Sequence, residues 1–342
     1  MEEAPFESGV WRYDAEEHEV ADHLGRRALR LVNGHATLAD AAFSDGIVQF
    51  DVALTPDRAF TGCTWRRRGD DFEWFWVRPH QSGNPDATQY TPAFNGISGW
   101  QLYHGPHYTA PVSLPFGVWM TVRVLFAGSV AEIYVGDLDR PALFVDDLKH
   151  EPRAGMVGVS ASLAPGWFSR FMFEESPAPP IQGRPAPPEP PVEEAIRMWA
   201  VSDPFPEDEL DLGTLEEHSW TILGAEPSGL ADLARVNGLD DRDTVFARAT
   251  IVSERAQTKR LDFGFSDRVT VFVNGQPLFS GSDGYRSRDY RFLGSIGWWD
   301  SVYLPLRPGR NDLVLAVSED FGGWGVQAKL ADLDGCSVEA PA

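Results

Sequence analysis

The sequence predicts an all-β protein of two domains, and three observations support this. Short runs of aromatic and β-branched residues recur along the chain, and glycine and proline separate them. Runs with the 3.6-residue period of an amphipathic helix are almost absent. Residues 176–191 hold eight of the 26 prolines and divide the 342 residues into two parts of ordinary domain size.

The first domain, residues 1–175, is expected to be a β-sandwich, because many short strands separated by turns are typical of that fold. Asp71–Val77 contains no glycine or proline, and its two-residue period places Phe72, Trp74 and Trp76 on one face. Pro79 ends this run because proline cannot donate a ladder hydrogen bond. The expected strands are Ala28–Val32, Gly46–Leu54, Phe60–Arg66, Asp71–Val77, Gly99–His104, Trp119–Phe126, Ser129–Val135 and Gly155–Ser160.

Residues 176–191 are expected to form a semi-rigid polyproline II linker. The second domain, residues 192–342, is again expected to be rich in strands. In Arg268–Phe279, Asn274 and Gly275 predict a type I′ hairpin turn, because both tolerate positive φ. The expected strands are Met198–Val201, Thr244–Ile251, Lys259–Phe265, Arg268–Val273, Gln276–Phe279, Ser301–Pro305, Asp312–Val317 and Gly325–Leu330.

Two resemblances refine these expectations. The first domain resembles concanavalin-A-like lectin and glucanase domains of the laminin-G-like kind, through Ala28–Leu31, Phe43–Leu54, Thr64–Arg66, Asp71–Trp76, Pro115–Trp119, Gly155–Val159 and Phe168–Phe171. The second resembles the galactose-binding-like jelly roll that accompanies the catalytic domain of family-2 β-glycosidases, through the hairpin RVTVFVNGQPLF and the segment LRPGRNDLVLAV. They imply a concanavalin-A-like sandwich followed by a jelly roll, and a fold likeness alone does not establish a reaction.

The function predicted from the residues is carbohydrate recognition. The loop after Val77 is crowded with side chains that combine flat apolar faces with polar edges, which is the surface a sugar ring complements. The ring of Tyr103 is expected to lie near the ligand. The candidate binding residues are Arg78, His80, Gln89, Tyr90, Trp100, Tyr103 and His104 in this loop, with Trp298 and Trp299 in the second domain.

Two alternatives stay open. The first is a glycoside hydrolase or polysaccharide lyase that uses Asp71 and Glu73, whose carboxylates on one strand face would lie about 6–7 Å apart. Laminarinase-type enzymes on this fold carry Glu-x-Asp-x-x-Glu, whereas this chain has Trp76 at the third position. A surface or hydrogen-bonding role for the pair is therefore favoured over catalysis. The second alternative is a structural module that binds proteins.

Composition and spacing exclude several partners. The formal net charge of −22 disfavours nucleic acid, and no apolar run reaches the roughly 18 residues of a membrane span. The start, MEEAPFESG, has no signal-peptide pattern, so the protein is expected to be cytoplasmic unless a leader has been removed, in which case it is extracellular or periplasmic.

Cofactor binding is not predicted. Cys63 and Cys336 are expected to be free thiols, and no CxxC motif is present. His80, His104 and His107 lack zinc-ligand spacing. The acidic residues 203–211 offer a structural Ca²⁺ site as the one metal hypothesis. The sequence leaves the sugar and the oligomeric state undetermined.

Overall fold

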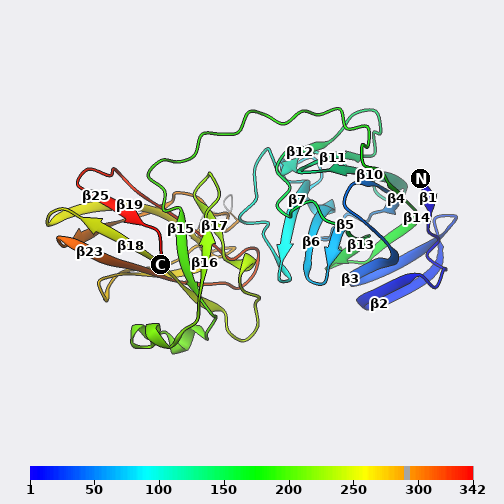
Figure 1. Cartoon of the computed structure of the whole chain (residues 1–342). Coiled ribbons are helices and arrows are strands. Elements are labelled where there is room, and N and C mark those ends of the chain that lie inside the picture. The colour runs from blue at the N-terminus through cyan, green and yellow to red at the C-terminus, as the bar shows by residue number, and fades with distance from the viewer. Residues whose placement is uncertain (289–292, 342) are drawn as a thin grey trace. The chain divides into compact units, whose positions relative to one another are not determined.

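Antiparallel β-strands make up almost all of the regular structure, which confirms the predicted all-β fold (Figure 1). The structure is a computed structural model and describes residues 1–288 and 293–341. It divides into two compact units. Unit 1 comprises Met1–Ala93 and Tyr103–Ala186, and unit 2 comprises Phe94–Leu102 and Pro187–Ala342.

Unit 1 is a curled antiparallel sheet with the strand order β12-β11-β10-β4-β14-β3-β13-β5-β6-β7. Trp65 of β5 and Phe126 of β10 lie far apart in this order, yet their ring centroids are 5.7 Å apart, because the sheet folds over one core. The strands are β1 (Glu2–Glu3), β2 (Trp11–His23), β3 (Arg26–Phe43), β4 (Gly46–Ala53), β5 (Phe60–Arg68), β6 (Asp71–Val77), β7 (Thr88–Phe94), β9 (Thr109–Ala110), β10 (Trp119–Ala127), β11 (Val130–Val135), β12 (Leu143–Val145), β13 (Gly155–Ser162) and β14 (Gly166–Glu175).

Unit 2 is built from two antiparallel sheets that enclose a second core. One has the order β16-β15-β18-β23-β20-β21, with β25 on β18, and the other has the order β17-β24-β19-β22. The strands are β15 (Met198–Ser202), β16 (Trp220–Gly224), β17 (Leu230–Asp232), β18 (Thr244–Ser253), β19 (Gln257–Ser266), β20 (Arg268–Val273), β21 (Gln276–Ser282), β22 (Asp300–Leu306), β23 (Gly309–Ser318), β24 (Gly325–Leu330) and β25 (Cys336–Glu339), with β8 (Ile97–Ser98) in the 94–102 segment.

Several local predictions are confirmed. β6, β20 and β24 have the bounds that the sequence predicts. Asn274 and Gly275 have φ of 49° and 77° between β20 and β21, as a type I′ turn requires. Cys63 and Cys336 are both free.

Residues 88–104 differ from the prediction. Thr88–Phe94, expected as loop, is strand β7, and it pairs with β6 from Phe72–Ala93 to Val77–Thr88. Gly99–His104, expected as a strand, contains turns instead, because the amide of Leu102 donates to the carbonyl of Gly99 at 3.0 Å.

Residues 94–102 belong to unit 2, although the sequence placed them in the first domain. Phe94 and Ile97 are part of the unit 2 core. Gln101 is fully buried, its amide donates to the carbonyl of Gly322 at 2.8 Å, and its side-chain Nε2 donates to the carbonyl of Leu293 at 2.9 Å. This short segment thus completes the fold of the other half of the chain.

The proline-rich stretch is also held more firmly than a free spacer would be, since residues up to 186 belong to unit 1. The buried carboxylate of Glu132 accepts hydrogen bonds from the amides of Gln182 at 3.1 Å and Gly183 at 2.7 Å. Asp146 accepts from the amide of Ala186 at 3.1 Å. Polyproline II leaves its amides unpaired, so these two carboxylates can bind the strap of residues 176–186 to unit 1.

The described part of the chain contains four short 3₁₀ helices, which are η1 (Pro79–Gln81), η2 (Glu207–Glu209), η3 (Leu212–Glu217) and η4 (Leu233–Arg235). No helix in residues 1–288 and 293–341 is long and apolar enough to cross a membrane.

Candidate functional site

Four of the predicted binding residues lie inside unit 1. Arg78, Gln89, Tyr90 and Tyr103 are 5%, 2%, 0% and 1% exposed. The guanidinium of Arg78 donates to Oε1 of Gln89, whose Nε2 donates to the carbonyl of Tyr103 at 2.7 Å. A ring that is 1% exposed offers no face to a sugar. The structure therefore corrects the expectation for Tyr103, whose loop is closed by this internal network.

The other predicted binding residues lie in separate places. His80 is half-buried and meets Phe60 edge-on with a centroid distance of 5.7 Å, while His104 is exposed. Trp100 belongs to unit 2. Trp298 and Trp299 also lie in unit 2, where Trp298 is half-buried and Trp299 is exposed. The nine residues therefore do not form one site within either unit.

The two candidate catalytic carboxylates have different surroundings. Asp71 is half-buried and lies 3.5 Å from the guanidinium of Arg153. Glu73 is fully buried and accepts hydrogen bonds from the hydroxyl of Tyr90 at 2.5 Å and the amide of His150 at 3.2 Å. Burial raises the pKa of Glu73 to about 7. The pair does not present two carboxylates to one open cleft, which is the arrangement that glycoside hydrolysis requires.

The opposite face of β6 carries a row of aromatic rings, as the period of the sequence predicts. Phe72, Trp74 and Trp76, here called the aromatic row, alternate with Phe75 and Val77, which belong to the unit 1 core. Ring centroids are 5.5 Å apart for Phe72–Trp74 and 4.7 Å apart for Trp74–Trp76. The aromatic row therefore lies on the side of the sheet that faces away from the core.

Neighbouring strands place polar side chains beside the aromatic row. Thr64 of β5 is directly opposite Trp74. The indole Nε1 of Trp74 donates to Oγ of Ser160 on β13 at 2.8 Å. His35 of β3 lies next to Ser160 in the sheet, and its ring is 5.3 Å from Trp74 and 5.4 Å from Phe72. We call Phe72, Trp74, Trp76, His35, Thr64, Arg67 and Ser160 the row face.

Four buried polar atoms of the row face have no hydrogen-bond partner among the described residues. They are Nδ1 of His35, Oγ1 of Thr64, Nε1 of Trp76 and Nη1 of Arg67. A buried polar atom without a partner costs about 1–3 kcal/mol, so most such atoms in folded proteins are paired. Four orphaned atoms around three aromatic rings are a feature that core packing does not explain.

Charge at the row face comes mainly from arginine. The guanidinium of Arg67 lies 4.7 Å from the ring centroid of Phe72, and that of Arg78 lies 5.6 Å from Trp76. Burial, together with the positive charge of Arg67, lowers the pKa of His35 to about 3. The imidazole is therefore neutral at pH 7 and has one nitrogen that donates and one that accepts.

Sequence reasoning identified the aromatic row but missed His35, Thr64 and Arg67 as its neighbours. The only signal for the row was the two-residue period of Asp71–Val77. No pattern in the sequence relates His35 to Trp74, because strand order in the sheet brings them together.

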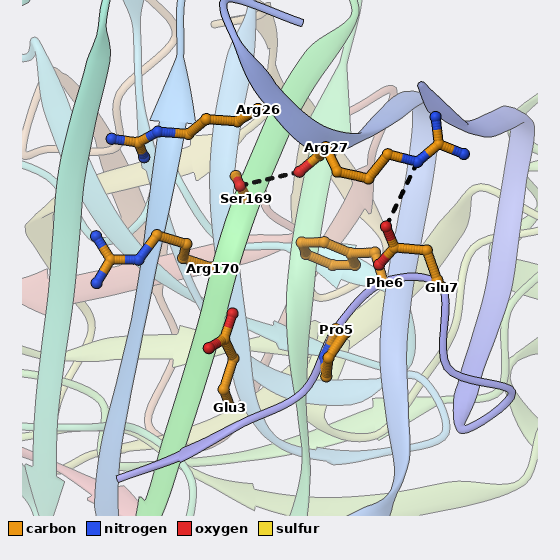
Figure 2. A pocket seen from close by; sticks show the side chains of 8 residues that line it. All are labelled: Glu3, Pro5, Phe6, Glu7, Arg26, Arg27, Ser169 and Arg170. Atoms are coloured by element: carbon orange, nitrogen blue, oxygen red, sulfur yellow. Dashed lines mark hydrogen bonds and ion pairs between the residues drawn. The ribbon is translucent and has the colours of Figure 1, made fainter. Parts of the chain in front are cut away.

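A separate recess in unit 1 has a volume of about 370 Å³ (Figure 2). Three arginines line it, but each lies close to a carboxylate. Arg26 and Arg170 lie 2.5 Å and 3.6 Å from Asp51, and Arg27 lies 3.4 Å from Glu7. These ion pairs balance the charge of the recess, so it has no excess positive charge for an anionic ligand.

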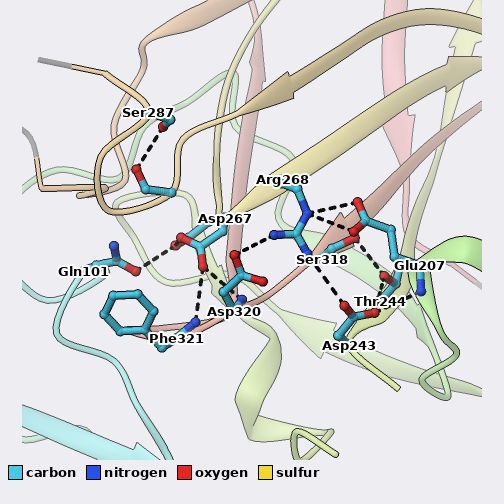
Figure 3. A network of polar contacts seen from close by, with 12 residues as sticks. Gln101, Glu207, Asp243, Thr244, Asp267, Arg268, Ser287, Ser318, Asp320 and Phe321 are labelled. Atoms are coloured by element: carbon cyan, nitrogen blue, oxygen red, sulfur yellow. Dashed lines mark hydrogen bonds and ion pairs between the residues drawn. The ribbon is translucent and has the colours of Figure 1, made fainter. Parts of the chain in front are cut away.

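The acidic residues proposed for Ca²⁺ are engaged with other groups. Glu207 is paired with Arg268 at 2.9 Å, in a network that also contains Asp243 and Asp320 (Figure 3). Asp211 caps η3 by accepting from the amide of Gly213. No group of three or more His, Cys, Asp or Glu side chains in the described parts of the chain is arranged to hold a metal ion.

Comparison with known proteins finds likeness in structure only. No family model and no curated protein matches the sequence. The carbohydrate binding module CBM66 from Bacillus subtilis is 14% identical, with a TM-score of 0.38 over 48% of this chain and 96% of that one. A Bacillus subtilis protein of unknown function with a galectin-like fold has 12% identity and a TM-score of 0.39 over 51% and 95%. A Bacillus licheniformis β-glucanase has 10% identity and a TM-score of 0.35 over 51% and 97%. Likenesses of this size carry no argument about function.

Proposed function

We propose that the protein binds a carbohydrate through the row face of unit 1. The observation that carries this proposal is the aromatic row beside four buried polar atoms that have no partner. A sugar ring has an apolar face that stacks on an aromatic ring and hydroxyl groups that donate and accept hydrogen bonds. The sugar would stack on Trp74, the half-buried ring of the row, while Phe72 and Trp76, which are 4% and 3% exposed, support that ring from its sides.

The proposed ligand belongs to the class that the sequence predicts, but the proposed site is the row face and not the loop that follows Val77. The predicted loop residues Arg78, Gln89 and Tyr103 form an internal network beside Trp76, while Trp74, the half-buried ring of the row, provides the contact with the sugar. Binding is supported better than cleavage, because the carboxylate of Glu73 lies on the core side of β6. A protein-binding module remains the outcome if no glycan binds.

Native gel electrophoresis in the presence of soluble polysaccharides tests the proposal. We expect at least one of xylan, mixed-linkage β-glucan, arabinan and galactan to retard the full chain. Trp74→Ala should weaken that retardation about fivefold, since one aromatic face contributes on the order of 1 kcal/mol. Trp167→Ala is the matched control, because Trp167 is a half-buried indole of unit 1 that stacks on His23 at 4.1 Å, away from the row face.

Thr64→Val separates a binding role from a structural one. Valine has the shape of threonine without the hydroxyl, and Oγ1 of Thr64 has no partner in the free protein. The variant should therefore raise the melting temperature and leave glycan binding unchanged, because Thr64 is 0% exposed and out of reach of a ligand. A variant that is less stable than the wild type, or one that loses glycan binding, would contradict this account. Absence of retardation by all four polysaccharides would refute the proposal as a whole.

A further inference from the structure

Three aromatic rings from distant parts of the sequence meet in unit 2. Trp100, Tyr285 and Phe321 have ring centroids 5.8–6.3 Å apart in each pair, and we call them the ring cluster. Their interplanar angles lie between 41° and 74°, so the rings form an angled surface and not a flat stack. Trp100 comes from the 94–102 segment, so the cluster exists only because that segment is part of unit 2.

The ring cluster is only partly covered. Phe321 is 50% exposed, and Trp100 and Tyr285 are each half-buried. Phe321 follows the exposed Asp320, and these two residues continue directly into Gly322 and Gly323. A partly open cluster of large rings is unusual on a water-facing surface and often marks a binding site.

Buried polar groups hold the backbone beneath the rings in one conformation. Oδ2 of Asp267 accepts from the amides of Asp320 at 2.9 Å and Phe321 at 3.2 Å. Figure 3 shows Phe321 next to Gln101 and Asp267. The amide of Gln101 donates to the carbonyl of Gly322, which ties the segment of Trp100 to that of Phe321. Because these hydrogen bonds hold the backbone beneath the rings before any ligand binds, binding would cost little conformational entropy of the protein.

Polar groups surround the rings and indicate the chemistry of the ligand. The carboxylate of Asp320 is exposed, although it is also paired with Arg268 at 2.6 Å. Ser287 is exposed, although its hydroxyl donates to the carbonyl of Gly284 at 2.8 Å, and the guanidinium of Arg286 lies 5.3 Å from the ring of Tyr285. Rings with such a polar rim suit a ligand that has both an apolar face and hydroxyl groups. A carboxylate at the rim, in a chain of net charge −22, disfavours an anionic ligand.

We infer that the ring cluster is a second carbohydrate site, which takes a neutral sugar unit of a polysaccharide. The apolar face of the sugar would lie on Phe321 and the neighbouring rings, and its hydroxyls would face Asp320 and Ser287. This inference extends the proposed function to unit 2 and can fail independently of it. Two sites joined in one chain would bind a polymer more tightly than either alone.

Electrophoresis of the full chain with the same four neutral polysaccharides tests the inference, with polygalacturonate as the anionic comparison. Phe321→Ala should weaken retardation by a neutral polysaccharide about fivefold, both alone and combined with Trp74→Ala. Tyr303→Ala is the matched control, because Tyr303 is a 66% exposed aromatic residue of the same unit on β22. Tyr303→Ala should migrate as the wild type does, and polygalacturonate should retard the chain least.

The other possible outcomes of the electrophoresis distinguish the two proposals. If Trp74→Ala removes all retardation and Phe321→Ala behaves as the wild type, the inference is overturned and the proposed function stands. If Phe321→Ala alone removes retardation, the ring cluster is the site and the row face is not. Stronger retardation by polygalacturonate than by any neutral polysaccharide overturns the assignment of a neutral ligand. If nothing retards the wild type, both proposals fall.

Discussion

Replacing Gln101 with alanine tests whether the 94–102 segment is an integral part of unit 2. Its Nε2 donates to the carbonyl of Leu293 at 2.9 Å, and its Oε1 accepts from the hydroxyl of Ser266 at 3.2 Å. Alanine would leave the half-buried carbonyl of Leu293 unpaired and would leave the hydroxyl of Ser266 only the longer contact with Oδ1 of Asp267 at 3.5 Å, at about 1–3 kcal/mol each before water or relaxation compensates. We therefore expect a loss of about 2–4 kcal/mol. For a unit of this size that corresponds to a fall of about 5–15 °C in melting temperature.

Hydrogen exchange measured by mass spectrometry locates the effect. Peptides from β19, β20 and β24 should lose protection in Gln101→Ala, while peptides from β4 and β10 should keep it. Gln276→Ala is the matched control, because Gln276 is exposed at the end of the β20–β21 turn. A melting temperature within 1–2 °C of the wild type, or loss of protection in β4 and β10 instead, would refute the assignment of this segment to unit 2.

Three further predictions concern charge, the strap and the thiols. Burial raises the pKa of Glu319 well above its ordinary value, and the nearby charge of Asp267 raises it further. The stability that the protonated Glu319 contributes at low pH is therefore lost as the pH rises through its pKa in the folded protein. Glu319→Gln should therefore raise the melting temperature at pH 8 and leave it nearly unchanged at pH 4, and an equal change at both would contradict the argument. An added Cβ at Gly183 would lie 2.4 Å from the ring of Phe144, so Gly183→Ala should speed hydrogen exchange of the strap amides, and unchanged exchange would count against the docking. Reducing agent should leave the melting temperature unchanged because both thiols are free, and a fall of several degrees would reveal a disulfide.

Local signals predicted many strands well. β6, β20 and β24 were predictable because each run contains no interior breaker and its apolar pattern has one clear period. Asn274 and Gly275 identified their turn because few other residue pairs adopt positive φ twice in succession.

The sequence did not predict β2 and β7, because both lack the local signals that identified β6, β20 and β24. β2 is too charged to look like a strand, yet among the described strands it pairs with β3 alone, at an edge where charge is tolerated. β7 contains Pro92 and reads as a loop, but pairing with β6 makes it a fully buried strand. In both cases the neighbour in the sheet, and not local propensity, decides the structure.

By itself, the sequence determined the all-β class and the faces of β6, and it suggested the class of ligand that we propose, because these depend on residues close together along the chain. Only the tertiary structure decided that Tyr103 is buried, that His35 and Thr64 lie beside Trp74, and that residues 94–102 fold with unit 2. The reason is physical: strand order and long-range packing join residues that no local period relates. Trp100 and Phe321 are separated by more than half the chain and become neighbours where the buried Gln101 ties their segments together.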